Sequence, residues 1–372
     1  MKYVDLERQY RRIQQDIDTG IKAVLEHGKY INGPEVAQLE TRLAQTAGTA
    51  HAIGCANGTD ALVLALMALD IGPGHAVIVP TFTFFATAEA VRLVGAVPVF
   101  VDIDERSYNI DPAAIEKAIA SHSEAGGPDL KAIITVDLFG LPADYDAISD
   151  IASSQGLYLI EDGAQSFGGS LGGRMACSFG DIATTSFFPA KPLGCYGDGG
   201  ALFTPNDDLA EVIRSLRQHG QGKDKYNNVR IGMNSRLDSL QAAVLNGKLS
   251  VFTEEIEARN AVADRYTEAL SETFVTPLIP SGYRSAWAQY TIRSRGKSRE
   301  FFQGQLKEAG IPTAVYYATP LHLQPAFADF SSGAGACPVA EQVSAEVFSL
   351  PMHPYLEDAE VTRVIDALLA AA

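Results

Sequence analysis

Short apolar runs rich in β-branched residues alternate with helix-like segments from about residue 50 to residue 205. We expect strands over residues 76–79, 97–101, 132–136, 157–160 and 183–187, and helices between them over residues 59–70, 86–94 and 143–155. This alternation predicts an α/β fold with a mostly parallel sheet that is covered by helices on both faces. Ligands of such sheets bind beyond the carboxyl ends of the strands, so the residues that follow the strands are the first candidates for a functional site.

The pattern changes after residue 234. A long helical stretch is expected over residues 235–266, followed by strands over 287–293 and 312–317 and helices over 299–309, 338–348 and 358–369. This tail is typical of a smaller α/β domain. Although no Pro/Gly/Ser-rich linker marks a boundary, we place one near residue 250. The division gives a large domain with an N-terminal arm over residues 1–250 and a small domain over residues 251–372.

Composition and charge exclude several classes of protein. The chain has 372 residues, of which 47% are hydrophobic and 20% charged, so it is neither disordered nor fibrous and is long enough to enclose a buried site. Its apolar runs, such as residues 61–69, are shorter than the ~20 residues that a membrane-spanning helix needs. The net charge of −16 disfavours nucleic acid as the main partner. An anionic substrate therefore needs a local positive pocket.

The cysteines and the first residues indicate the compartment. Cys55, Cys177, Cys195 and Cys337 lie far apart and have neither the pattern of a disulfide framework nor that of a zinc site, so no metal is predicted. The first ten residues are charged and lack the apolar core of a signal peptide. These features favour a reducing, cytoplasmic setting.

One lysine is the most informative candidate for chemistry. Lys191 stands between the expected strand that ends near Ser186 and a glycine-rich turn, in the segment Ser-Phe-Phe-Pro-Ala-Lys-Pro-Leu-Gly-Cys-Tyr-Gly-Asp-Gly-Gly. A desolvated lysine loses its proton more easily and becomes an amine that can form a Schiff base. The alternative is a lysine that only closes the loop.

An acid follows a neighbouring strand. Asp162 ends the buried run that begins at residue 157, and Gln165 and Ser166 come just after it. A carboxylate at this point could keep the ring nitrogen of a pyridine cofactor protonated, which strengthens the pull of the ring on electrons. The alternative for Asp162 is an ordinary cap at a strand-to-loop turn.

The segment Asn57-Gly58-Thr59-Asp60 follows a strand and opens a helix. Its free backbone N–H groups and the positive helix end could bind a phosphate, although Thr59 could equally serve as a plain helix cap. We expect the Asp60 side chain to turn away from a phosphate. The chain lacks GxxxxGK[ST], so a Walker-type nucleotide loop is not predicted. An aromatic ring after another strand, at Phe82 or Phe84, could stack on a flat cofactor or simply pack in the core.

Taken together, these segments resemble the nucleotide-sugar aminotransferases of the DegT/StrS group, fold-type I enzymes that depend on pyridoxal 5′-phosphate. Nearly the whole chain shares the likeness, which is carried by Tyr-Ile-Asn-Gly-Pro-Glu from residue 30, Gly-Thr-Asp-Ala-Leu from 58, Glu-Asp-Gly-Ala-Gln-Ser from 161, residues 186–200 and Gly-Met-Asn-Ser-Arg-Leu-Asp from 232. The resemblance implies that Lys191 forms the Schiff base with the cofactor and that Asp162 pairs with the pyridine nitrogen. It also implies the remaining cofactor contacts: Gln165 near the ring hydroxyl, Gly58, Thr59 and Ser186 at the phosphate, and Phe84 stacked on the ring. Asp60, next to Thr59, is counted among the cofactor-binding residues of the same segment.

The same likeness implies a homodimer with shared sites, because the asparagine matching Asn234 reaches the phosphate of the second subunit. Relatives with histidine at the lysine position are dehydratases, so Lys191 argues against that branch. The implied substrate-side residues are Arg236, Tyr316, Tyr317 and His322. Arg236 could bind a sugar carboxylate or form an interface ion pair with Asp238 or another acid, and His322 could be structural. Tyr316 stands where some C3 enzymes have histidine.

The resemblance is nearest to members that aminate C3 of a UDP-linked 3-oxo sugar, notably UDP-2-acetamido-2-deoxy-3-oxo-glucuronate. It implies a ping-pong transamination with glutamate as amino donor, in the synthesis of bacterial surface-polysaccharide sugars such as those of the lipopolysaccharide O-antigen. The alternatives are amination at C4, a sugar dehydratase or amino-acid aminotransferase on the same scaffold, and a regulator that binds the cofactor without turnover.

Overall fold

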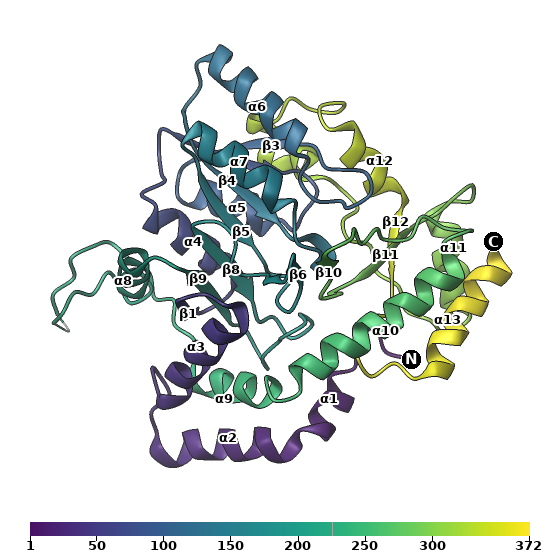
Figure 1. Cartoon of the computed structure of the whole chain (residues 1–372), viewed down its shortest axis with the longest axis horizontal. Coiled ribbons are helices and arrows are strands. Elements are labelled where there is room, and N and C mark those ends of the chain that lie inside the picture. Colours follow the sequence, from purple (N-terminus) through teal and green to yellow (C-terminus); the bar gives the residue numbers. More distant parts are fainter. Residues whose placement is uncertain (225) are drawn as a thin grey trace.

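The computed structural model describes residues 1–224 and 226–372. Its centre is a seven-stranded sheet with the strand order β1-β9-β8-β5-β4-β2-β3 (Figure 1). These strands are β1 (His51–Cys55), β2 (His75–Pro80), β3 (Val97–Val101), β4 (Asp129–Val136), β5 (Tyr158–Asp162), β8 (Ile182–Ser186) and β9 (Gly200–Thr204). Only β9 is antiparallel to its neighbours in this sheet. The predicted α/β fold with a mostly parallel sheet is confirmed.

Helices cover both faces of the sheet because its strands are apolar on both sides. In β2, Val77 and Val79 pack in one core cluster and Ile78 packs in another, as the alternation of side chains along a strand requires. The first cluster includes residues of α4 (Gly58–Ala68), α5 (Ala86–Leu93) and α8 (Asp207–Leu216). The opposite face is covered by α6 (Pro112–Ala125), α7 (Tyr145–Gln155), α3 (Pro34–Ala47) and α9 (Ser239–Lys248).

The second half of the chain ends in a separate core. A two-stranded antiparallel sheet packs there with three helices, and the elements are α10 (Phe252–Leu270), β11 (Tyr290–Arg293), α11 (Arg299–Glu308), β12 (Val347–Leu350) and α13 (Asp358–Ala371). Met1 packs against this core, ahead of α1 (Leu6–Arg12) and α2 (Gln14–His27), so both termini lie at the same end of the molecule (Figure 1). The buried residues of α12 (Pro338–Glu346) pack in a different cluster, with Phe82 and Val136.

Short elements complete the fold. A small three-stranded sheet has the order β10-β6-β7, and three short 3₁₀ helices interrupt loops of the described chain. These elements are β6 (Ser170–Leu171), β7 (Arg174–Met175), β10 (Tyr283–Arg284), η1 (Leu138–Gly140), η2 (Leu321–Leu323) and η3 (Pro325–Phe330).

Four predicted elements of the tail were wrong in detail. The expected helix over residues 235–266 is broken between α9 and α10, where the N–H groups of Ser250 and Val251 bond carbonyls only three residues back, at Gly247 and Lys248, which tightens the backbone into a turn. Residues 312–317 form no strand and make only one bridge, from Ala314 to Ser349. The helix expected to reach residue 348 ends at Glu346, because Val347 begins β12. The strand expected over 287–293 covers only β11, and the domain boundary near residue 250 stays a prediction.

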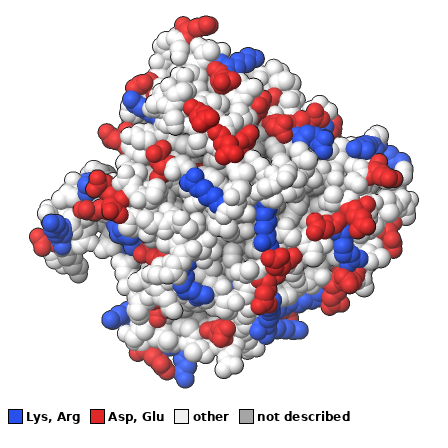
Figure 2. Space-filling view, viewed as in Figure 1, with Lys and Arg blue, Asp and Glu red and all other residues white. Residues whose placement is uncertain are grey.

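The surface carries both signs of charge. On the face shown in Figure 2, acidic and basic side chains are interspersed rather than gathered in one basic patch. In the described part of the chain, no helix has the length and apolar character needed to cross a membrane. All four cysteines are buried and free.

Candidate active site

The ends of two neighbouring parallel strands bring an acid and an amine together. Asp162 is the last residue of β5, and Lys191 lies in the turn that follows β8, the next strand in the sheet. Asp162 is buried, which raises the pKa of its carboxyl group, and the Lys191 charge opposes that shift. Burial lowers the pKa of Lys191 to about 8, and the nearby Asp162 carboxylate opposes part of this decrease. The Lys191 amine therefore gives up its proton more easily than an ordinary lysine does.

Two hydrogen bonds orient the Asp162 carboxylate. The Thr87 hydroxyl donates to Oδ2 over 3.0 Å, and the backbone N–H of Ala164 donates to Oδ1 over 3.2 Å. Thr87 lies on α5 and also contacts the Thr83 hydroxyl, at 3.2 Å between the oxygens. Thr87 was not among the residues predicted from the sequence. The available signal was a polar residue among the small apolar residues on the buried face of a helix that follows a sheet strand.

The start of α4 offers free donors beside Ser186. The Asn57 side chain accepts the Asp60 N–H over 2.8 Å, and the Ala61 N–H bonds the Asn57 carbonyl, which leaves the N–H groups of Gly58 and Thr59 unpaired among the described residues. A Cβ on Gly58 would lie 2.8 Å from the Ser186 Cβ, so the absence of a side chain keeps this space open. The structure thus brings Gly58, Thr59 and Ser186 together, as predicted.

Asp60, which was predicted to be a cofactor-binding residue, is not placed to contact a phosphate at the start of α4. Its backbone N–H is already bonded to Asn57, and its side chain lines a groove on the surface of α4. A phosphate at the start of α4 therefore has no donor from Asp60, and the expected turning away of its carboxylate fits the structure.

An amide and two aromatic rings lie on the other side of the acid. Gln165 is buried, its Oε1 accepts the Phe139 N–H over 2.8 Å, and its Nε2 lies 3.4 Å from the Tyr317 hydroxyl. The Tyr317 ring is 6.3 Å from that of Phe84 between centroids. Phe84 is 56% exposed, whereas Phe82 is buried, so only Phe84 has a ring face open to a ligand.

Four predicted residues remain: His322, Tyr316, Asn234 and Arg236. His322 is buried, and both ring nitrogens already have partners, Thr81 Oγ1 at 2.5 Å and Glu341 Oε1 at 3.0 Å, which favours the structural alternative for this residue. Tyr316 is half-buried against Tyr3. Asn234 is exposed beyond α8, and Arg236 is half-buried and forms no ion pair within the described residues. The ion pair of Arg236 with Asp238 is therefore not present within one subunit.

The groups at this edge of the sheet fit pyridoxal 5′-phosphate. Its phosphate matches the unpaired N–H groups and the Ser186 hydroxyl, since a helix N-terminus with free donors attracts an anion. A ring nitrogen that must stay protonated needs a buried, oriented carboxylate, and an aldehyde needs an amine of lowered pKa. The fold and this constellation define a pyridoxal phosphate-dependent enzyme of fold type I.

Comparison with known proteins gives the family. Residues 11–369 match the model of the DegT/DnrJ/EryC1/StrS aminotransferase family, and the chain belongs to that family. It is 51% identical over 369 residues to the UDP-2-acetamido-2-deoxy-3-oxo-D-glucuronate aminotransferase of Pseudomonas aeruginosa, which covers 99% of both chains.

Solved structures agree with this assignment. A DegT/DnrJ/EryC1/StrS aminotransferase from Brucella abortus has a TM-score of 0.97 and 51% identity, covering 100% of this chain and 99% of the other. NtdA from Bacillus subtilis, solved with the bound cofactor PMP, has a TM-score of 0.90 and 31% identity, covering 100% of this chain and 85% of the other. The protein is thus a sugar aminotransferase with pyridoxal phosphate as cofactor.

Proposed function

We propose that this enzyme transfers an amino group to C3 of a UDP-linked 3-oxo sugar, best UDP-2-acetamido-2-deoxy-3-oxo-D-glucuronate, with glutamate as the donor. The observation that carries the proposal is the 51% identity, over 99% of both chains, to the Pseudomonas enzyme of that name. The presence of Lys191 rather than histidine favours transamination over dehydration. The product is an amino sugar for bacterial surface polysaccharide, such as the O-antigen of lipopolysaccharide.

Different residues of the site contact different parts of the cofactor in this proposal. Gly58, Thr59 and Ser186 hold the phosphate through two backbone N–H groups and a hydroxyl. Asp162 accepts a hydrogen bond from the protonated ring nitrogen, and Phe84 stacks on the ring. Gln165 donates from Nε2 to the ring hydroxyl, because its Oε1 is occupied by the Phe139 N–H.

Proton transfer falls to Lys191. When bound, pyridoxal phosphate supplies an aldehyde that accepts an amino group and a ring that stabilises negative charge. Lys191 would hold the cofactor through its amine, and when that amine is free it would take the proton from the Cα of glutamate. In the second half of the reaction, Lys191 returns a proton to C3 of the sugar. A pKa near 8 suits a group that must both accept and donate a proton near neutral pH.

The substrate carboxylates need a cation. Arg236 is half-buried and has no acidic partner among the described residues, so its guanidinium is available to bind a carboxylate in a bidentate manner. Tyr317 lies between Phe84 and Gln165, where its hydroxyl can contact a substrate bound above the cofactor ring. Tyr316, next to it, belongs to the same wall.

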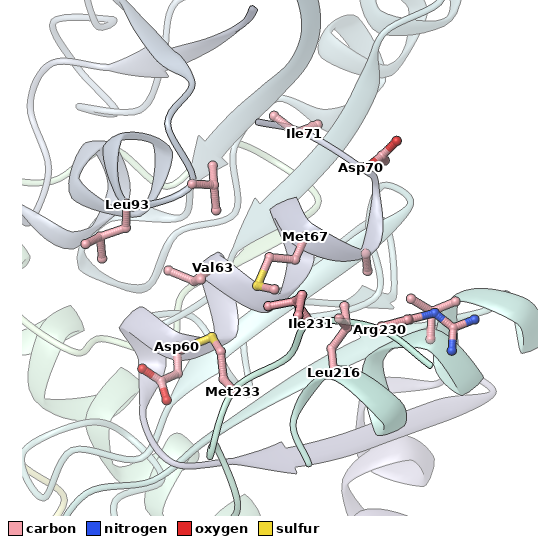
Figure 3. Close-up of a pocket in the computed structure, with 13 residues that line it drawn as sticks. Asp60, Val63, Met67, Asp70, Ile71, Leu93, Leu216, Arg230, Ile231 and Met233 are labelled. Carbon is pink, nitrogen blue, oxygen red and sulfur yellow. The ribbon is translucent and has the colours of Figure 1, made fainter. Parts of the chain in front are cut away.

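We further propose a homodimer in which Asn234 completes the phosphate site of the partner. A groove of about 820 Å³ separates α4 from the segment that precedes Asn234, with Val63 and Met67 on α4 and Ile231 and Met233 on that segment (Figure 3). Ile231 is 89% exposed, an unfavourable position for an apolar side chain in a monomer. A second copy of the chain would cover this groove.

A panel of nucleotide-linked keto sugars with glutamate tests the activity. Mass spectrometry should detect the replacement of the sugar oxygen by an amine in the UDP-linked 3-oxo glucuronate. Turnover of C4-oxo sugars alone would reject amination at C3, and loss of water without consumption of glutamate would indicate a dehydratase. A cytoplasmic location is part of the proposal and agrees with the four free cysteines.

A further inference from the structure

A buried carboxylate behind the site joins the two loops that meet at Gln165. Asp137 follows β4, its side chain is completely buried, and it has no ion-pair partner in the described chain. It accepts three hydrogen bonds instead: from the Ser166 hydroxyl at 2.7 Å on Oδ2, and from the Tyr145 hydroxyl at 2.7 Å and the Ala143 N–H at 2.9 Å on Oδ1. A carboxylate has lone pairs for all three donors and no proton to conflict with them.

The first of these loops contains a strained residue that points at Gln165. Phe139 has φ 59° and ψ 3°, a left-handed conformation that is uncommon for a bulky side chain. In this conformation its N–H reaches Oε1 of Gln165. The turn is held at one end by the Ala143 bond to Asp137 and along its length by Asn109, which bonds Leu138 and Leu141.

The second loop carries Gln165 itself. Ser166, the next residue, is also completely buried, and its hydroxyl is tied to Asp137. The backbone adds a further link, since the Asp137 N–H donates to the Asp162 carbonyl over 3.1 Å. Glu161, the other buried acid nearby, accepts the N–H groups of Cys177 and Phe179 and also interacts with Asp137. Burial and the Asp137 charge raise the pKa of Glu161 well above its usual range, so Glu161 keeps its proton and can donate it in a hydrogen bond to Asp137, which remains the ionised member of the pair.

We propose that Asp137 is a positioning residue that fixes the amide orientation of Gln165 by holding the Phe139 turn and the Ser166 loop in register. With Oε1 of Gln165 occupied by Phe139, its Nε2 is the end that faces the cofactor. If the two loops separate, the amide is free to rotate, and its donor is lost from the ring oxygen. The inference rests on the proposed cofactor role of Gln165.

Two variants, each of which removes a single hydroxyl group, test this role. Ser166→Ala removes the 2.7 Å hydrogen bond on the side of the Gln165 loop, and Tyr145→Phe removes a 2.7 Å hydrogen bond to the same carboxylate on the other side. Both lose one buried hydroxyl donor, so both should lower the melting temperature of the protein. Only Ser166→Ala should disturb Gln165.

The readout is the visible absorption band of the bound cofactor, titrated with pH. A donor to the ring oxygen stabilises its ionised form, so a looser Gln165 should raise the pH midpoint of the band by about half a unit or more in Ser166→Ala. Tyr145→Phe should keep the wild-type midpoint, and Asp137→Asn should shift it as Ser166→Ala does if that variant folds. Equal midpoints in Ser166→Ala and Tyr145→Phe would overturn the role of Asp137. A wild-type protein that forms no such band would overturn the cofactor site itself, which separates the two failures.

Discussion

The Thr87 hydroxyl donates to Oδ2 of Asp162 over 3.0 Å, so a helix that packs behind the sheet edge orients the acid of the site. This bond stabilises the ionised carboxylate, against the burial that raises its pKa. A carboxylate that stays ionised can keep a pyridine nitrogen protonated. Thr87 would thus support the electron-withdrawing role of the ring through its bond to Asp162.

Replacement of Thr87 tests this support. Thr87→Val keeps the shape and removes the donor, so the pKa of Asp162 should rise further and kcat should fall by about ten-fold, as expected for the loss of one hydrogen bond to a charged group. Steady-state kinetics at saturating donor and sugar measures this effect. Thr87→Ser keeps the hydroxyl and should remain near the wild-type rate. Equal losses in the two variants would mean that packing, not the hydrogen bond, is what matters.

Gly58 should control cofactor affinity more than stability. In Gly58→Ala the new Cβ would lie 2.8 Å from the Ser186 Cβ. Either the backbone around the proposed phosphate site must move, or the methyl group occupies space that the phosphate needs. We expect the dissociation constant for pyridoxal phosphate to rise by about ten-fold or more, which corresponds to roughly 1.4 kcal/mol. Fluorescence titration of the cofactor-free protein measures it.

The matched control is Gly304→Ala on α11, where nothing lies within 4 Å of the added Cβ. This change should leave cofactor affinity unaltered and stabilise the helix slightly, because alanine is the better helix former. An unaltered affinity in Gly58→Ala would remove Gly58 from the phosphate site.

Much of this site follows from the strand pattern. The apolar runs that end at Asp162 and Ser186 were recognisable as neighbouring parallel strands, and parallel strands bring the residues after their carboxyl ends together. The roles of Thr87 and Asp137 were not predictable in this way. Each depends on a hydrogen bond between elements distant in the sequence, and a single threonine or aspartate has no periodic signal.

What the sequence left open has similar causes. For His322 a substrate role and a structural role were both possible, and the contacts of its two ring nitrogens with Thr81 and Glu341, which favour the structural one, arise only in the folded chain. The apolar positions around Val347 fit both the end of a helix and a short strand, and pairing with β11 decides between them. Tertiary contacts, rather than local preference, determine these features.

The lowered pKa of Lys191 predicts how stability depends on pH. Between about 8 and the ordinary value of 10.5, the unfolded chain binds a proton at Lys191 that the folded, cofactor-free protein does not. The free energy of unfolding should therefore rise with pH over this interval, by roughly 1 to 2 kcal/mol once solvent screening of this half-buried residue is allowed for. Denaturant titrations at several pH values measure this slope.

The variant Lys191→Met isolates the contribution. It should be more stable than the wild type below pH 8, and the difference should shrink as pH increases, because the desolvated charge is gone. Lys248, whose pKa burial also lowers to about 8, remains in both proteins and cancels in the comparison. A constant difference at all pH values would show that Lys191 titrates normally.

The proposed sharing of sites between two subunits predicts how mixed dimers behave. Lys191→Ala removes the amine from its own site, and Asn234→Ala removes the proposed phosphate contact from the partner's site, so each homodimer should have little activity. In a heterodimer of the two variants, one site lacks both groups. The other site retains Lys191 from one chain and Asn234 from the other and is therefore complete.

Mixing the two inactive variants, with unfolding and refolding to exchange subunits, should consequently restore about a quarter of the wild-type activity. Random pairing makes half of the dimers heterodimers, and each heterodimer has one complete site of two. Mixing Lys191→Ala with Asp162→Ala is the control, since both residues belong to the same chain's site and no complete site can form. If the first mixture stays as inactive as the control, Asn234 serves its own subunit or none, whereas recovery near one quarter would place the asparagine across the dimer interface.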